Sequence, residues 1–304
     1  MRDDTKRTYR GRFAPSPTGR LHFGSLVAAV GSFLDARHHQ GEWLVRIEDL
    51  DRTREVQGCA AEILSNLDAF GLHWDREVVY QSQRTEHYAE AVDRLLAADL
   101  AYPCNCSRKQ IRELAEPGAD GPIYPGTCRS GKGMIHAPHS IRLLTEDREI
   151  RFTDRLQGMF VQNPGRQIGD FVIRRVDGYH AYQLAVVVDD AWQEITDVVR
   201  GADLLSSTPR QCYLQQRLGL DQPNYLHLPL AVDRTGRKLS KQDRDRPVDA
   251  KDPLTILLRV LAFLQQPLPA ERPMNVESLW QWAIPNWRLE TIPANAKPGF
   301  SLEP

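Results

Sequence analysis

RFAPSPTGRLHFGS, residues 12–25, is the stretch that decides the fold of this chain. Its two prolines, Pro15 and Pro17, fix φ near about −65° and keep the residues before them out of helical angles, which predicts an extended start. A Thr-Gly turn follows, and from Leu21 onward apolar residues recur every three or four positions, as on one face of a helix. The stretch therefore predicts a strand, a tight turn and the first turns of a helix.

The beginning of this helix is a candidate binding site for an anion. The first turn of a helix carries unpaired backbone N–H groups and a positive dipole, and both favour phosphate. His22 falls in that first turn, and Gly24 has no side chain to keep a ligand away from the backbone. Spacing alone also allows an ordinary strand–turn–helix with a chance histidine.

Two segments resemble the signatures of a known family. PSPTGRLHFGSL, residues 15–26, resembles the signature of glutamate-type class I aminoacyl-tRNA synthetases, with HFGS in place of the family's HIGH tetrapeptide. KLSKQ, residues 238–242, occupies the place of the family's KMSKS loop and keeps both lysines, although Leu239 and Gln242 depart from it. The resemblance implies three catalytic residues, His22, Lys238 and Lys241. It also implies that ATP, used with Mg²⁺, contacts His22, Gly24, Ser25 and Lys241.

A second candidate site follows the next predicted strand, residues 43–47, which ends in Glu48. Ligands bind at the carboxyl ends of strands in a parallel α/β sheet, although a solvated Glu-Asp pair is the alternative. RIEDLDRTR, residues 46–54, resembles the family's RIEDTD segment, in which the matching glutamate contacts the amino acid. The resemblance implies a glutamate-binding site made of Arg12, Phe13, Ala14, Pro15, Ser16, Glu48, Tyr182 and Arg200.

The chemistry of the last two residues fits that role. A guanidinium can pair with a carboxylate through two hydrogen bonds, and a phenol can donate one. Core packing for Tyr182, and a surface ion pair between Arg200 and Asp203, are the alternatives.

Three of the five cysteines, Cys104, Cys106 and Cys128, lie within 25 residues. In a cytoplasmic protein such crowding favours a structural zinc site over disulfides, because thiolates suit tetrahedral zinc. A closed site needs a fourth ligand, and His136 and His139 are chemically suitable. The family resemblance instead points to Tyr124, because the Tyr-x-x-x-Cys spacing matches that of the family's short, tRNA-modifying members. A cysteine loop without metal is the alternative.

Composition limits the class of protein. The chain has 304 residues, 41% of them hydrophobic and 26% charged, as in a soluble globular protein with one large or two modest domains. A net charge of −1 gives no global sign of nucleic-acid binding, so such a surface must be local. No signal peptide or run of about 20 apolar residues is present, so we expect a cytoplasmic protein without membrane contact.

The order of the predicted elements indicates an α/β protein with a doubly wound, Rossmann-like nucleotide-binding domain. A small α+β insertion with the zinc loop is expected to split this domain, and short helices follow at the end. Residues 184–188, LAVVV, are predicted to be a strand buried on both faces. The expected segments are the first half, 1–100, the insertion, 101–177, the second half with the KLSKQ loop, 178–242, and a helical subdomain, 243–304.

The resemblance is strongest to the short members of the family, because only 62 residues follow Gln242. This number is too small for the anticodon-binding region of full-length glutamyl-tRNA synthetases. Short members activate glutamate with ATP and transfer it to the queuosine base in the anticodon of tRNA(Asp). The resemblance therefore implies glutamate, ATP and queuosine-containing tRNA(Asp) as partners of a monomeric ligase. Charging of a tRNA 3′ end, or tRNA binding without catalysis, are the alternatives.

Overall fold

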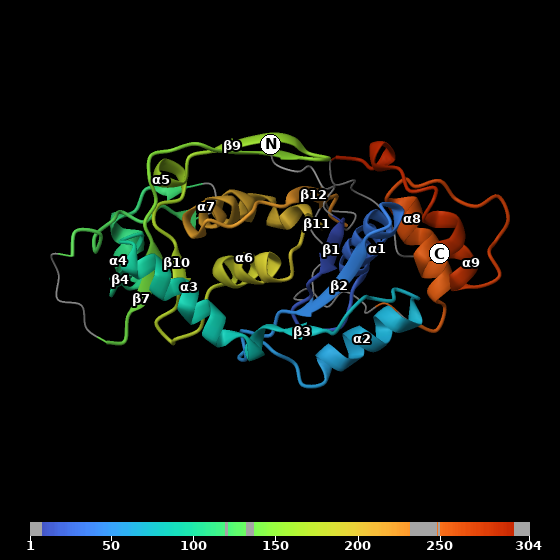
Figure 1. Cartoon of the computed structure of the whole chain (residues 1–304), viewed down its shortest axis with the longest axis horizontal. Coiled ribbons are helices and arrows are strands. Elements are labelled where there is room, and N and C mark those ends of the chain that lie inside the picture. Colours follow the sequence, from blue (N-terminus) through green and yellow to red (C-terminus); the bar gives the residue numbers. More distant parts are fainter. Residues whose placement is uncertain (1–7, 119–120, 132–136, 232–247, 249, 295–304) are drawn as a thin grey trace.

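The computed structural model describes residues 8–118, 121–131, 137–231, 248 and 250–294 (Figure 1). The predicted KLSKQ loop, with Lys238 and Lys241, lies outside the described residues, as does His136. Where the chain is described, it forms an α/β protein in which helices flank twisted sheets (Figure 1). No helix in this part of the chain is both long and apolar enough to cross a membrane.

The N-terminal third alternates strands and helices, as the sequence predicts. Its elements are β1 (Arg10–Phe13), α1 (Phe23–His38), β2 (Glu42–Ile47), α2 (Cys59–Ala69), β3 (Val79–Tyr80), a 3₁₀ turn (Gln81–Gln83) and α3 (Thr85–Ala97). The three strands pair in parallel, with β2 in the middle. Strand β3 was not predicted, because two residues are too few to show a periodic pattern.

A second group of parallel strands lies beside this sheet. Its elements are α6 (Tyr182–Trp192), β11 (Asp197–Gly201), a 3₁₀ turn (Ala202–Ser207), α7 (Thr208–Leu218) and β12 (Asn224–Leu228). Strand β11 pairs in parallel with β12 and also contacts β1. The Thr196 N–H donates to the Arg10 carbonyl at 3.0 Å where these edges meet. The strands therefore lie in the spatial order β3-β2-β1-β11-β12, with β1 of one sheet beside β11 of the other.

The prediction of a strand at residues 184–188 is wrong, because these residues lie inside helix α6. A run of five apolar residues cannot distinguish a buried strand from a buried helix. Helix α6 is buried on most of its surface, so even its Asp189 and Asp190 are covered. As a result Tyr182 lies in the first turn of a helix rather than before a strand.

The middle of the chain forms two small sheets and short helices. Its elements are β4 (Ala101–Cys104), α4 (Arg108–Leu114), β5 (Pro117–Gly118), β6 (Gly121–Pro122), β7 (Ser140–Leu143), β8 (Ile150–Asp154), β9 (Gly158–Gln162), α5 (Pro164–Gln167) and β10 (Val172–Arg174). Strands β4, β7 and β10 form an antiparallel sheet. The β8–β9 hairpin instead joins the second parallel group, because β8 pairs with β12.

Two C-terminal helices cover one end of the molecule, next to α1 (Figure 1). They are α8 (Pro253–Phe263) and α9 (Val276–Ala283), followed by a 3₁₀ turn (Leu289–Thr291). Phe263 packs edge-on against Phe23 of α1 at 5.7 Å between ring centroids, and Trp280 packs against Phe33 at 5.3 Å. These helices therefore share the hydrophobic core of α1.

Candidate active site

A cleft of about 600 Å³ opens where β1, β2, β11 and β12 end and α1 begins. The carboxyl edge of a parallel sheet is where α/β proteins bind ligands. All the predicted ligand residues of this site that the structure describes line the cleft: Arg12, Phe13, Ala14, Pro15, Ser16, His22, Gly24, Ser25, Glu48, Tyr182 and Arg200. Positions as distant in sequence as 12 and 200 thus meet in one cavity.

His22 caps the N-terminus of α1. It is thus the N-cap residue and not, as predicted from the sequence, a residue of the first turn. Its Nδ1 accepts a hydrogen bond from the Ser25 N–H at 3.2 Å. Nδ1 therefore carries no proton, and Nε2–H is the group that can donate to Ser25 Oγ at 2.9 Å. A Cβ on Gly24 would lie 3.1 Å from the His22 ring, so glycine leaves room for this arrangement.

Beneath the cleft, Asp190 of α6 holds two buried arginines. Arg12 donates through Nε and Nη2 to the two carboxylate oxygens of Asp190, at 3.1 and 3.2 Å. Arg46 Nη1 lies 2.8 Å from the same carboxylate. Burial alone would raise the pKa of Asp190, but the two guanidiniums outweigh it and lower this pKa below its usual value. The Asp190 carboxylate therefore stays ionised. Because it accepts from Nε and Nη2 of Arg12, Nη1 is the Arg12 nitrogen that does not contact Asp190.

Glu48 lies at the edge of this charge network, with its side chain 8% exposed. Its carboxylate is 3.4 Å from Arg46 Nη2. Burial is the largest effect on its pKa, and the nearby Asp189 and Asp190 add to it. Together they exceed the opposing pull of Arg46 and Arg12 and raise the pKa of Glu48 to about 7. Such a group gains most from a cationic ligand, because a cation would stabilise its ionised form.

Arg200 of β11 is held on nearly all of its hydrogen-bonding edge. Nε donates to His227 Nε2 at 3.0 Å, and Nη2 donates to Thr208 Oγ1 and Gln211 Oε1 at 2.9 and 2.8 Å. Nη1 approaches the Tyr182 hydroxyl at 3.4 Å. A guanidinium has five N–H groups, so Nη1 is the nitrogen that remains for a ligand in the cleft. The surface ion pair with Asp203 is not needed to explain this residue, because Arg200 is buried.

His227 fixes Arg200 through a specific tautomer. Its Nδ1 lies 2.6 Å from Asp154 Oδ2, and an ionised carboxylate can only accept, so Nδ1 carries the proton. Nε2 therefore carries a lone pair, which accepts the hydrogen bond from Arg200 Nε. Burial lowers the pKa of His227, and Arg200 lowers it further against the pull of Asp154. The ring accordingly stays neutral at pH 7.

Four residues of this site were not predicted as functional: Arg46, Asp189, Asp190 and His227. Asp189 accepts from Arg84, Gln81 and Tyr88 and so anchors α3 to α6. The sequence signal that could have identified Asp189 and Asp190 is their position directly after the apolar run at residues 184–188. Because that run reads as a strand from its composition, the position of both carboxylates on a buried helix stayed hidden.

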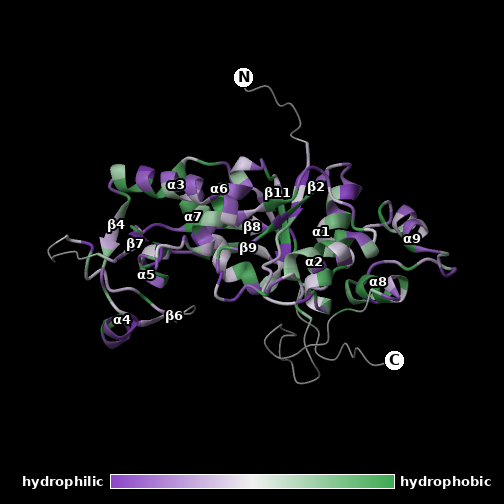
Figure 2. Cartoon of the chain, turned by 90° about the horizontal axis from the view of Figure 1, so that it is seen from below, coloured by the Kyte–Doolittle hydropathy of each residue, from purple (hydrophilic) through white to green (hydrophobic). Residues whose placement is uncertain are grey.

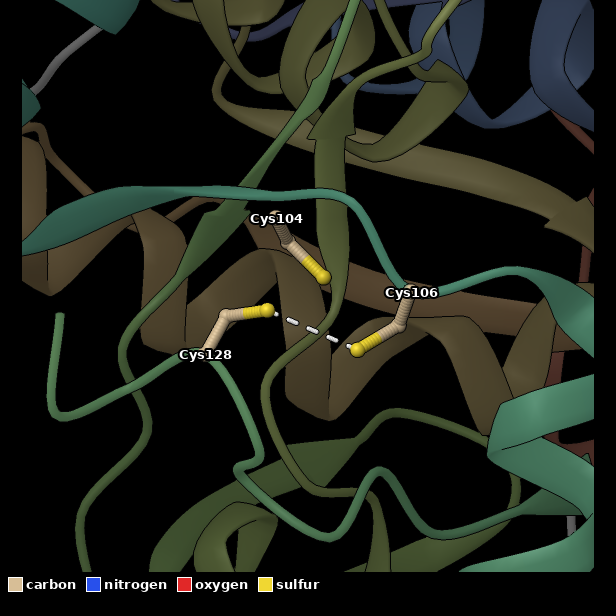
Figure 3. A group of neighbouring side chains, drawn as sticks. All are labelled: Cys104, Cys106 and Cys128. Atoms are coloured by element: carbon tan, nitrogen blue, oxygen red, sulfur yellow. Dashed lines mark hydrogen bonds between the residues drawn. The ribbon is translucent and has the colours of Figure 1, made fainter. Parts of the chain in front are cut away.

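A separate cluster brings three cysteines together beside β4 (Figure 3). The sulfurs of Cys104, Cys106 and Cys128 all lie within 4.8 Å of one another and point toward a common centre. The Tyr124 hydroxyl completes the group, at 3.3 Å from Cys104 Sγ and 3.4 Å from Cys106 Sγ. These spacings fit a tetrahedral metal, since a Zn–S bond of about 2.3 Å places sulfurs roughly 3.8 Å apart.

Neighbouring residues orient this donor set. Arg142 Nε donates to Cys104 Sγ at 3.2 Å, and its guanidinium stacks 3.9 Å above the Tyr124 ring. Burial opposes ionisation of Cys104, but hydrogen bonds from Tyr124 and Arg142 outweigh it and lower the pKa of this thiol to about 7. Gly169 lets the chain pass close to Tyr124, because a Cβ there would lie 2.7 Å from the Tyr124 nitrogen. His139 does not belong to the group of metal-ligating side chains found among the described residues.

The comparisons with known proteins agree with this architecture. The family described as tRNA synthetases class I (E and Q), catalytic domain, matches residues 8–255. A crystal structure of the glutamate-tRNA synthetase from Elizabethkingia anophelis superposes with a TM-score of 0.78 at 25% identity, over 98% of this chain and 69% of that one. The fold is therefore the α/β fold of class I synthetases.

Relatives of similar length narrow the assignment. The Glutamyl-Q tRNA(Asp) synthetase of Dechloromonas aromatica is 54% identical over 94% of this chain and 96% of its own length. That of Chromobacterium violaceum is 51% identical over the same shares. The chain thus belongs to the class I (E and Q) tRNA synthetases and, within them, to the Glutamyl-Q tRNA(Asp) synthetase family. The resemblance drawn from the two signatures is confirmed.

The cysteine cluster gives a first test. We expect about one equivalent of zinc in the purified protein and its loss in Cys106→Ser, because this variant keeps only two of the thiolates that bind zinc most strongly. Tyr124→Phe keeps the three thiolates and should release zinc to a chelator faster than the wild type. Elemental analysis and chelator-release rates measure both. Cys59→Ser, in α2 and away from the cluster, is the matched control. A wild type that holds no zinc, even after incubation with it, would refute the site.

Proposed function

We propose that this chain activates glutamate with ATP and transfers it to the queuosine base in the anticodon of tRNA(Asp). The observation that carries the proposal is the charge pattern of the cleft, in a chain 54% identical to a Glutamyl-Q tRNA(Asp) synthetase. The least exposed charged side chains that line the cleft are two guanidiniums, Arg12 and Arg200, and one carboxylate, Glu48. Glutamate carries the complement, two carboxylates and one ammonium. The other charged residues of the lining are more exposed: Asp51, Arg54, Arg175 and Asp203.

In this proposal each charge of glutamate has a partner. Arg12 and Arg200 each offer Nη1, because their other nitrogens are occupied by Asp190 and by residues of β12 and α7. Glu48 receives the ammonium, and its raised pKa falls when that cation binds. The Tyr182 hydroxyl adds a hydrogen bond, and residues 13–16 line the pocket beside it.

Activation requires a carboxylate oxygen of glutamate to attack the α-phosphorus of ATP, with pyrophosphate leaving as the mixed anhydride forms. The start of α1, with His22, Gly24 and Ser25, lies in the cleft beside the glutamate residues and would hold the nucleotide. Lys238 and Lys241, with Mg²⁺ on the phosphates, would neutralise charge that develops in the transition state. A queuosine hydroxyl then attacks the anhydride carbonyl, and AMP leaves.

We also propose that the cysteine cluster holds one structural zinc through Cys104, Cys106, Tyr124 and Cys128. The donor set and its spacing support this assignment. On this view, residues 1–100 and 178–242 form the two halves of a doubly wound domain, and residues 101–177 form a zinc-containing insertion between them. Residues 243–304 make the helical subdomain.

The function is tested by ATP-dependent attachment of labelled glutamate to three RNAs: queuosine-containing tRNA(Asp), tRNA(Asp) without queuosine, and tRNA(Glu). We expect label on the first alone. Label on the 3′ end of tRNA(Glu) would assign ordinary charging instead. Absence of label from all three, together with absence of glutamate-dependent pyrophosphate exchange, would leave a tRNA-binding protein without catalysis.

Glu48 predicts a specific pH dependence of glutamate binding. Its pKa near 7 in the free protein means that the ionised fraction rises about tenfold from pH 6 to pH 8. Since the ionised form binds the ammonium, the Kd for glutamate should fall by about that factor over this range. Calorimetric titration without ATP measures it. Glu48→Gln should bind weakly with no such slope; an unchanged slope would assign the titration to another group.

His227 predicts a selective effect on glutamate. Removing the acceptor of Arg200 in His227→Leu should raise KM for glutamate in pyrophosphate exchange about tenfold to a hundredfold, the value of a hydrogen bond to a charged group. KM for ATP should stay close to that of the wild type. His227→Gln, which restores an acceptor, should recover part of the loss. Equal effects on both substrates, or none on either, would contradict the positioning role.

A further inference from the structure

A second cavity, of about 470 Å³, lies between α4, the β10-β7-β4 sheet and the first turns of α7. It is distinct from the cleft and shares no lining residue with it. Its charged lining, among the described residues, consists of Arg108, Arg112, Arg142, Arg210 and Asp170. Four guanidiniums therefore surround this cavity in a protein whose net charge is only −1.

The one carboxylate in the lining is already neutralised. Asp170 receives Nη2 and Nε of Arg129 at 2.6 and 2.9 Å, as well as the Thr145 backbone N–H and hydroxyl. Burial would raise the pKa of Asp170, but these hydrogen bonds, with one from Tyr102, lower it. The carboxylate and Arg129 thus cancel each other, and Arg108, Arg112 and Arg142 give the lining an excess of positive charge.

Arg142 lines the cavity with a buried side chain and is not a surface residue. Its side chain is buried, Nε donates to Cys104 Sγ, and Nη1 donates to the Asp170 carbonyl at 2.7 Å. Nη2 has no hydrogen-bond partner among the described residues, and it is the nitrogen left for the cavity. Nη2 is not among the buried atoms without a partner in the described chain, so it is accessible from the cavity, where an anion could accept its hydrogen bonds.

Helix α4 adds two exposed arginines on one side. Arg108 and Arg112 are four residues apart, a spacing at which like charges repel on a helix. Within the described chain neither has an ion-pair partner, whereas Lys109 of the same helix lies 3.9 Å from Glu113. Figure 2 shows α4 as a strongly hydrophilic helix at the edge of the molecule. An anion between these arginines would relieve their repulsion.

The cavity also adjoins the cleft through a single turn of helix. Arg210 lines the cavity from α7, while Thr208 and Gln211 of the same turn hold Arg200 in the cleft. A polymer with a base in the cleft would carry its next phosphates past this turn. A small free anion would give no reason for the two sites to be adjacent.

We propose that this arginine cavity binds backbone phosphates of the RNA substrate, so that the nucleotides next to the modified base run from the cleft across the start of α7 to α4. The inference rests on the proposed function, because it takes the RNA to be tRNA(Asp). Phosphate contacts of this kind position RNA without reading its sequence.

The test is the double variant Arg108→Gln/Arg112→Gln, which removes two charges and keeps side chains suited to a helix. Filter binding of queuosine-containing tRNA(Asp) over a range of salt concentrations gives Kd and its salt dependence. We expect Kd to rise about tenfold and the slope of log Kd against log salt to fall by about two, one for each phosphate that an arginine no longer neutralises. Zinc content and glutamate-dependent pyrophosphate exchange should match the wild type.

Lys109→Gln is the matched control, since it removes a charge from the same helix outside the cavity. It should leave Kd and the slope nearly unchanged. An unaltered Kd and slope in the double variant, or an equal effect of Lys109→Gln, would overturn the cavity assignment while transfer to tRNA(Asp) by the wild type still stands. Failure of that transfer in the wild type would instead refute the proposed function.

Discussion

The carboxylate of Asp190, which holds Arg12 of β1 and Arg46 of β2 at once, is the interaction on which the cleft depends. Arg12 and Arg46 are separated from Asp190 by 178 and 144 residues in sequence. Neither half of the chain can therefore form this charge network alone. Removing one member of such a buried network leaves an uncompensated charge, which costs about 3–5 kcal/mol. The network therefore holds helix α6 against strands β1 and β2.

The same network explains why a carboxylate can serve as a ligand at this position. Glu48 lies beside two guanidiniums, Arg12 and Arg46. Asp190 and Asp189 already balance their charges, so they stabilise the Glu48 anion only in part. Without a ligand its proton is weakly held near neutral pH, and a bound ammonium would displace it. Arg200, in contrast, is held by neutral acceptors, His227, Thr208 and Gln211, and keeps its full charge for a carboxylate. The cleft thus has a region of negative charge at Glu48 and a region of positive charge at Arg200.

The sequence predicts the parts of this site that depend on local order. The turn into α1, the end of β2 and the clustered cysteines all follow from neighbouring residues, and the resemblance to a family supplied Tyr124, Tyr182 and Arg200. Helix α6 was mistaken for a strand because its apolar run has no period. That mistake also hid the position of Asp190, and a second reason applies to both Asp190 and His227. Their partners lie far away in sequence, and no local pattern distinguishes a carboxylate that will bind a buried arginine from one that will face water.

The middle of the chain is tied to the cleft more closely than an appended module would be. Asp154, at the end of β8, fixes the tautomer of His227 and through it the orientation of Arg200. The Tyr213 hydroxyl of α7 donates to the Leu144 carbonyl, just after β7. Helix α7 therefore contacts Arg200 of the cleft, the arginine cavity and the sheet beside the cysteine cluster. RNA bound in the arginine cavity would contact α7, the same helix that holds Arg200. The binding of RNA and of glutamate would therefore be coupled through the first turn of α7.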